Sequence, residues 1–95
     1  MTPLPRTPEL QELARQLVWF EAPDKALADA ARFMAYAFAR GTPPQMALLR
    51  RVLDEDAWRQ ALAQAPPGII NQRSWAYWNL MLDRWPAPPL LERRA

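Results

Sequence analysis

The chain has 95 residues, of which 51% are hydrophobic and 23% charged, and its formal net charge is +2. This length supports one domain with one core, and the hydrophobic content is too high for a disordered chain. Cysteine and histidine are absent, which excludes disulfides, thiol nucleophiles, Ser-His-Asp triads and zinc sites with nitrogen or sulfur ligands. No apolar run approaches the roughly 20 residues of a membrane span, and no signal peptide is evident. We expect a cytoplasmic protein with neither metal nor cofactor.

The first predicted helix follows an extended, frayed lead-in over residues 1–6. Thr7 is its N-cap and Pro8 its first helical position. We expect it to continue through residues 19–21 and to end before Pro23, because proline disfavours helix in the residue that precedes it. Its apolar stripe, at helical spacing, consists of Leu10, Leu13, Ala14, Leu17 and Val18.

Three further helices are predicted between residues 24 and 65. The first covers residues 24–40, or starts only at Asp29 as N-cap, and Gly41 ends it in a left-handed conformation. Thr42 caps the second helix, and the acidic residues 54–56 cap and open the third. The residues expected to face inward are Phe33, Met34, Ala37, Phe38, Met46, Leu49, Val52, Leu53, Ala57, Trp58, Ala61, Leu62 and Ala65.

An aromatic helix is predicted after the break at residues 66–68, capped by Asn71 and ended by Pro86. At about 100° per residue, Tyr77 and Leu80 fall outside its apolar stripe. We expect the other helices to enclose that stripe, which consists of Trp75, Trp78, Met81, Leu82 and Trp85.

The predicted fold is all-α, a compact bundle of about five short helices in a single domain over residues 1–95. The helical core covers residues 7–86, and residues 87–95 form an extended, proline-rich tail. Residues 90–94 (Leu-Leu-Glu-Arg-Arg) either fold back onto the domain, which we favour, or bind a partner.

Catalytic residue types are scarce in this sequence. Ser74 is the only serine, and glycine occurs only at positions 41 and 68, so a phosphate-binding glycine loop is excluded. The one dense acidic group, residues 54–56, consists of consecutive residues that splay around a helix and therefore suits a cap better than a catalytic site. We expect no enzymatic activity.

DNA binding is the alternative function. The two helices predicted within residues 42–65 resemble a helix-turn-helix, with Arg50, Arg51 and Arg59 near the turn. The acidic residues 54–56 stand at the end of the recognition helix that would approach phosphates, which repels a polyanion. Nucleic acid is therefore the less favoured partner.

Protein binding is the favoured function, because tryptophan, tyrosine and arginine dominate interface hot spots. The candidate residues are Trp19, Arg73, Tyr77, Leu80 and Arg84. The competing interpretation is that such aromatic residues form the core of a small domain. A third hypothesis is a structural homo-oligomer in which the aromatic helix pairs with its own copy.

Short motifs at intervals along the chain carry a family resemblance. They are Val18-Trp19-Phe20-Glu21, Ala26-Leu27-Ala28-Asp29, Arg40-Gly41-Thr42, Ala65-Pro66-Pro67-Gly68 and Arg73-Ser74-Trp75-Ala76-Tyr77-Trp78. Over residues 13–94 the chain resembles small uncharacterised bacterial proteins encoded beside abortive-infection (AbiEii-like) nucleotidyltransferase toxins, although Ala30 stands where that pattern has proline. The resemblance implies an antitoxin-like protein that binds the adjacent nucleotidyltransferase, and it supplies no catalytic residues.

Overall fold

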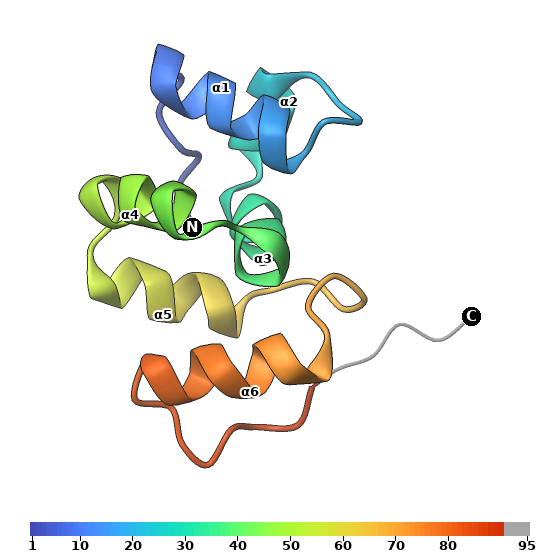
Figure 1. The fold of residues 1–95 in the computed structure, drawn as a ribbon, viewed down its shortest axis with the longest axis vertical. Helices are drawn as coiled ribbons and strands as arrows, with labels where there is room; N and C mark the ends of the chain where they lie inside the picture. Colours follow the sequence, from blue (N-terminus) through green and yellow to red (C-terminus); the bar gives the residue numbers. More distant parts are fainter. Residues whose placement is uncertain (91–95) are drawn as a thin grey trace.

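The structure, a computed structural model, describes residues 1–90 and contains six helices and no strand over that range. The helices are α1 (Pro8–Leu17), α2 (Pro23–Ala28), α3 (Ala30–Arg40), α4 (Pro43–Val52), α5 (Glu55–Ala63) and α6 (Gln72–Met81). The all-α fold class is confirmed, with one helix more than predicted (Figure 1). None of these helices is both long and apolar enough to cross a membrane.

The helix starts follow the predicted N-caps. In each of five helices the capping side chain accepts a hydrogen bond from the backbone N–H three residues later, which satisfies a free donor of the first turn. The caps are Thr7, Asp29, Thr42, Asp54 and Asn71. Only α2 lacks such a bond, and it begins with Pro23 at the position where proline favours a helix start.

The ends of the first two helical segments differ from the prediction. Helix α1 ends at Leu17, and residues 18–22 form a turn where a continuous helix was expected. The guanidinium of Arg40 donates hydrogen bonds to the carbonyl of Leu17, 3.1 Å from Nε, and so satisfies a free acceptor of the last turn. The following helix is divided at Asp29, whose φ of −106° and ψ of 84° are not helical.

Gly41 does not adopt the predicted left-handed conformation. Its φ of −67° and ψ of 136° are extended, because Thr42 already caps the next helix and the chain must leave α3 at once. Glycine is needed here for space. A Cβ atom at this position would meet the sulfur of Met46 and lie 2.7 Å from the carbonyl oxygen of Ala37.

Helix α6 ends at Met81, five residues earlier than Pro86. Asp83 takes the left-handed conformation with φ of 58°, and the backbone N–H of Arg84 donates to the carbonyl of Asn79 at 2.7 Å, as in a Schellman ending. The chain therefore turns away before Trp85 completes the predicted stripe. Met81 and Trp85 are 48% and 62% exposed, so their placement in the core was wrong, as was that of Val52 at 36%.

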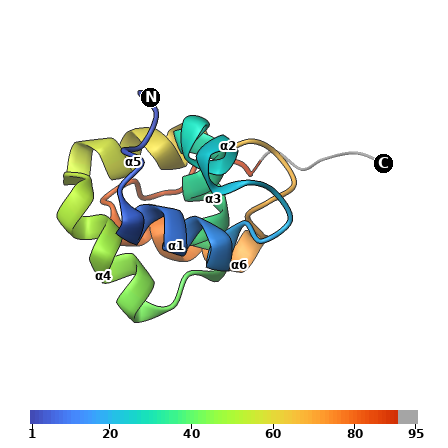
Figure 2. The ribbon, with the colours of Figure 1, turned by 90° about the horizontal axis from the view of Figure 1, so that it is seen from above.

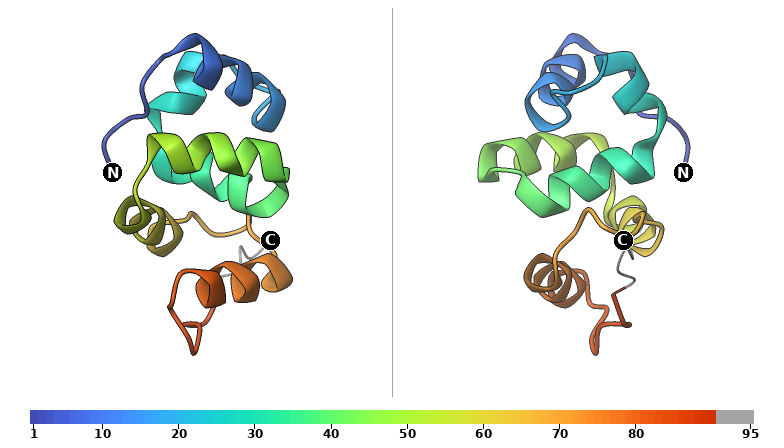
Figure 3. Two further views of the ribbon diagram at one scale, coloured as in Figure 1. Left: turned by 60° about the vertical axis from the view of Figure 1, so that its left-hand side comes forward. Right: turned by 90° about the vertical axis from the view of Figure 1, so that its right-hand side faces the viewer.

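The helices form three layers around α3 (Figures 1 and 3). Helices α1 and α2 lie at one end, α3 and α4 in the middle, and α5 and α6 at the other end. Helix α3 contacts α1, α2, α5 and α6, and it buries six side chains around most of its circumference, namely Ala30, Phe33, Met34, Ala35, Ala37 and Phe38. The centre of the fold is thus α3, and α6 closes one end. The radius of gyration is 12.7 Å, close to the ~12 Å of a folded chain of this length.

Both terminal segments pack against the domain. Leu4 is 4% exposed and its backbone N–H donates to the carbonyl of Leu27 at 2.9 Å, so the lead-in over residues 1–6 is anchored and not frayed. Viewed from above, this segment crosses over α5 before it enters α1 (Figure 2). At the other end, Nε1 of Trp75 donates to the carbonyl of Pro88 at 2.7 Å, and Leu90 is partly buried. The predicted return of the tail holds as far as Leu90, and residues 91–95 lie outside the described residues.

Candidate functional site

Three of the five predicted partner-binding residues lie on one face of α6. Arg73, Tyr77 and Leu80 follow the i, i+4, i+7 spacing of a helical face, opposite the buried Trp75, Asn79 and Leu82. Tyr77 is 53% exposed and Leu80 is 56% exposed. Met81 extends the same exposed surface, because it lies one turn after Tyr77. We call Arg73, Tyr77, Leu80 and Met81 the α6 stripe.

The α6 stripe rests on a rigid aromatic support. The ring of Tyr77 packs edge-to-face on Trp78, with centroids 5.1 Å apart. Nε1 of Trp78 donates to the carbonyl of Phe38 at 3.0 Å, and the ring of Trp78 contacts both Phe38 and Trp58. The exposed tyrosine is therefore preorganised, which lowers the entropy lost when such a side chain is immobilised in an interface.

Trp19 lies far from the α6 stripe, in the turn between α1 and α2 at the opposite end of the molecule (Figure 1). It is 72% exposed and packs edge-to-face on Phe20, which in turn packs on Tyr36. Arg32 bonds to Glu21 and lies over the Tyr36 ring at 5.4 Å, and the hydrogen bond to Glu21 raises the pKa of Arg32. The structure thus separates Trp19 from the other candidates.

Arg84 also lies outside the α6 stripe. It follows the end of α6 and is only partly exposed, and Nη1 of its guanidinium is buried with no hydrogen-bond partner among the described residues. It lines a small cavity between the α5–α6 connection and residues 88–90. Arg84 is therefore partly enclosed by the protein, unlike an interface arginine, which is exposed on an open surface.

Of the three arginines of the DNA-binding alternative, Arg59 is held by several groups of the protein, whereas Arg50 and Arg51 are exposed and make one contact each within residues 1–90. Arg59 donates from Nε to the carbonyl of Leu82 at 2.8 Å, and it pairs with three acids, Asp56 at 3.1 Å, Glu55 at 3.5 Å and Asp83 at 3.8 Å. Arg50 lies 4.7 Å over the ring of Trp58, and Arg51 is 3.9 Å from a carboxylate oxygen of Glu9. Together with the acids that open α5, this arrangement gives no support to contact with a polyanion.

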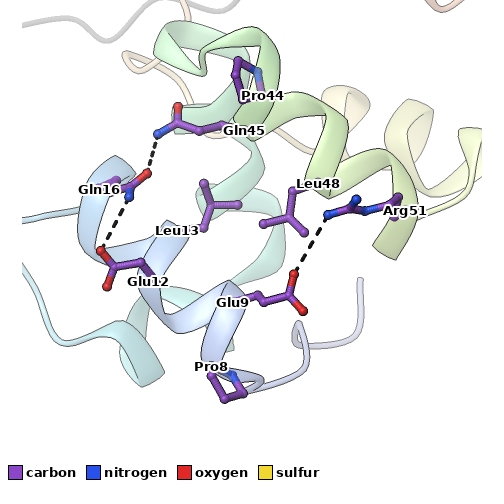
Figure 4. A pocket seen from close by; sticks show the side chains of 9 residues that line it. All are labelled: Pro8, Glu9, Glu12, Leu13, Gln16, Pro44, Gln45, Leu48 and Arg51. Atoms are coloured by element: carbon purple, nitrogen blue, oxygen red, sulfur yellow. Dashed lines mark hydrogen bonds and ion pairs between the residues drawn. The ribbon is translucent and has the colours of Figure 1, made fainter.

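A groove of about 570 Å³ separates α1 from α4 (Figure 4). Leu13 and Leu48 form its apolar floor. Its polar rim groups pair across it, since Nε2 of Gln45 donates to Oε1 of Gln16 at 2.9 Å and Arg51 approaches Glu9. The rim groups of the groove thus contact one another.

The sequence pattern missed two exposed apolar residues, Met81 of the α6 stripe and Trp85 beyond the end of α6. Both were assigned to the core because the helix was expected to continue to Pro86. The signal that marks the earlier end is the bond from Arg84 N–H to Asn79, which a residue pattern without glycine at position 83 does not reveal. Comparisons with protein-family models, with curated proteins and with solved structures found no match.

Proposed function

We propose that this chain is a non-enzymatic protein-binding module and that it binds its partner through the α6 stripe. The observation that carries the proposal is the exposure of Tyr77 and Leu80, with Met81, on a helix face opposite the buried Trp75, Asn79 and Leu82. Large apolar side chains grouped on one rigid element, beside an arginine, have the composition of an interface hot spot.

The partner we propose is a nucleotidyltransferase toxin of the kind encoded beside the proteins that this chain resembles. The support is the sequence resemblance together with the interface character of the α6 stripe. Binding at such a surface would neutralise the toxin by covering it, which requires no catalytic group on this chain. The test is co-expression with the adjacent nucleotidyltransferase, followed by affinity capture and a growth assay.

The decisive variant is Tyr77→Ala combined with Leu80→Ala. Both side chains are more than half exposed, so we expect cooperative unfolding to be retained while affinity for the partner falls at least ten-fold. Trp19→Ala is the matched comparison, because it removes a larger exposed aromatic group from the other end of the molecule. Calorimetric titration of the captured partner with each variant measures the difference.

Two outcomes would contradict the proposal. Absence of association with the nucleotidyltransferase, with unchanged toxicity, would exclude that partner. Equal affinity of the double variant and the unmodified chain would exclude the α6 stripe as the binding surface. Light scattering of the chain alone completes the experiment, because concentration-dependent dimers lost in the double variant would assign the α6 stripe to self-association.

A further inference from the structure

A cavity of about 210 Å³ lies between the α5–α6 connection, the buried side of α6 and residues 88–90. Its walls are mostly apolar, with Pro66, Ile70, Trp75 and Leu90 among the lining residues. The bond from Nε1 of Trp75 to the carbonyl of Pro88 holds the tail over it at 2.7 Å. The cavity is therefore built from three segments of the chain and fixed by a hydrogen bond.

Among residues 1–90, Arg84 is the one charged residue that lines this cavity. Its backbone N–H is held by Asn79 at 2.7 Å, so its side chain starts from a fixed point. Nη1 is buried and has no acceptor within residues 1–90. The Arg84 side chain as a whole is partly exposed and forms no ion pair within residues 1–90, so its guanidinium can pair with an anion that enters the cavity.

The geometry points to a binding site for a small monocarboxylic acid with an apolar body, its carboxylate paired with Arg84 and its body against Trp75 and Ile70. A carboxylate matches one guanidinium in charge and in its two-pronged shape. A phosphate would bring up to two negative charges to a site with one cation and apolar walls. The volume suits roughly seven to ten non-hydrogen atoms, the size of a benzoate.

This site is independent of the proposed protein-binding surface. Trp75 lies on the core side of α6, whereas Tyr77 and Leu80 lie on the opposite side. A ligand held between Trp75, Arg84 and Leu90 would strengthen the packing of residues 88–90 against α6. Loss of the carboxylate site would leave the α6 stripe intact, so the two proposals succeed or fail separately.

The test is titration of the full-length, ¹⁵N-labelled protein with benzoate, followed through its tryptophan indole N–H signals. We expect saturable movement of the Trp75 signal with a Kd of about 0.1–1 mM, as is typical for a ligand of this size. The Trp19 signal, at the far end of the molecule, should not move. Benzamide is the matched neutral probe and should bind at least ten-fold more weakly, because it lacks the charge that pairs with Arg84.

Arg84→Gln should weaken benzoate binding at least ten-fold, and Arg84→Lys should retain part of it. The Gln variant is expected to fold, since it removes a buried group without a partner. Inorganic phosphate should leave the Trp75 signal unchanged. The proposal is overturned if benzoate does not move the Trp75 signal at millimolar concentration, if benzamide binds equally well, or if Arg84→Gln binds benzoate like the unmodified chain.

Discussion

Gly41 connects α3 to α4 at a point where no side chain fits. Its backbone is extended, so a substitution would not strain φ, and the whole effect of Gly41→Ala should come from steric overlap with Met46 and with the carbonyl of Ala37. We expect a loss of about 1–3 kcal/mol in the free energy of unfolding, the usual range for overpacking. Urea denaturation measures this loss.

The same substitution in a Met46→Ala background separates the two overlaps. Removing the thioether relieves the contact with sulfur but leaves the Ala37 carbonyl 2.7 Å away, so the penalty of Gly41→Ala should shrink without vanishing. An unchanged stability of Gly41→Ala itself would show that the junction between α3 and α4 relaxes freely. The position of Gly41 just after a helix correctly indicated that glycine is required there. The requirement comes from the lack of room for a side chain and not from a left-handed φ.

At the scale of whole elements, helix starts were predictable, and so was the end of α3 at Arg40, but the ends of α1 and α6 were not. A start depends on a cap such as Asp54 or Asn71 and the three residues that follow, all adjacent in sequence. At the ends of α1, α3 and α6, side chains from distant elements donate hydrogen bonds to backbone carbonyls. Arg40 donates to Leu17 at the end of α1. Trp78 donates to Phe38 in α3, and Arg59 donates to Leu82 after α6. Such long-range pairs leave no local pattern.

In the candidate site, too, features set by neighbouring residues were predictable from the sequence, and features set by distant residues were not. The spacing within α6 placed Tyr77 and Leu80 outside the apolar stripe, and both side chains are more than half exposed. Asn79 shows the limit, because helical geometry turns it toward the core while its polarity suggests the surface. It is fully buried, its Nδ2 donates to the Trp75 carbonyl at 2.8 Å, and its Oδ1 has no partner within residues 1–90.

The N-terminal segment is an element without regular structure, and Leu4 anchors it. Leu4→Ala should lower the free energy of unfolding by about 2–4 kcal/mol, because the side chain is 4% exposed in the core and its removal leaves a cavity. Thr2→Ala, at an exposed position of the same segment, is the control and should change stability by less than about 0.5 kcal/mol. Equal stability of both variants would mean that the segment is detached in solution.

The whole molecule depends on contacts that join its layers through α3. Phe38 from α3, Trp58 from α5 and Trp78 from α6 form an aromatic cluster with ring centroids 5.3–5.6 Å apart. Trp78 also satisfies the Phe38 carbonyl at the end of α3. Since every helix contributes residues to one buried cluster, we expect the protein to unfold in a single cooperative transition.

Trp78→Phe tests whether that cluster couples the layers. The variant keeps an aromatic ring but loses the donor to Phe38 and part of the packing volume, so we expect a loss of about 1–3 kcal/mol with the transition still cooperative. For a domain of this size each kcal/mol corresponds to a fall of about 4–8 °C in Tm. Trp85→Phe, 62% exposed, should leave Tm nearly unchanged. If Trp78→Phe instead produces two separate transitions by calorimetry, α6 unfolds independently of α3, and the α6 stripe rests on a weaker support than the structure indicates.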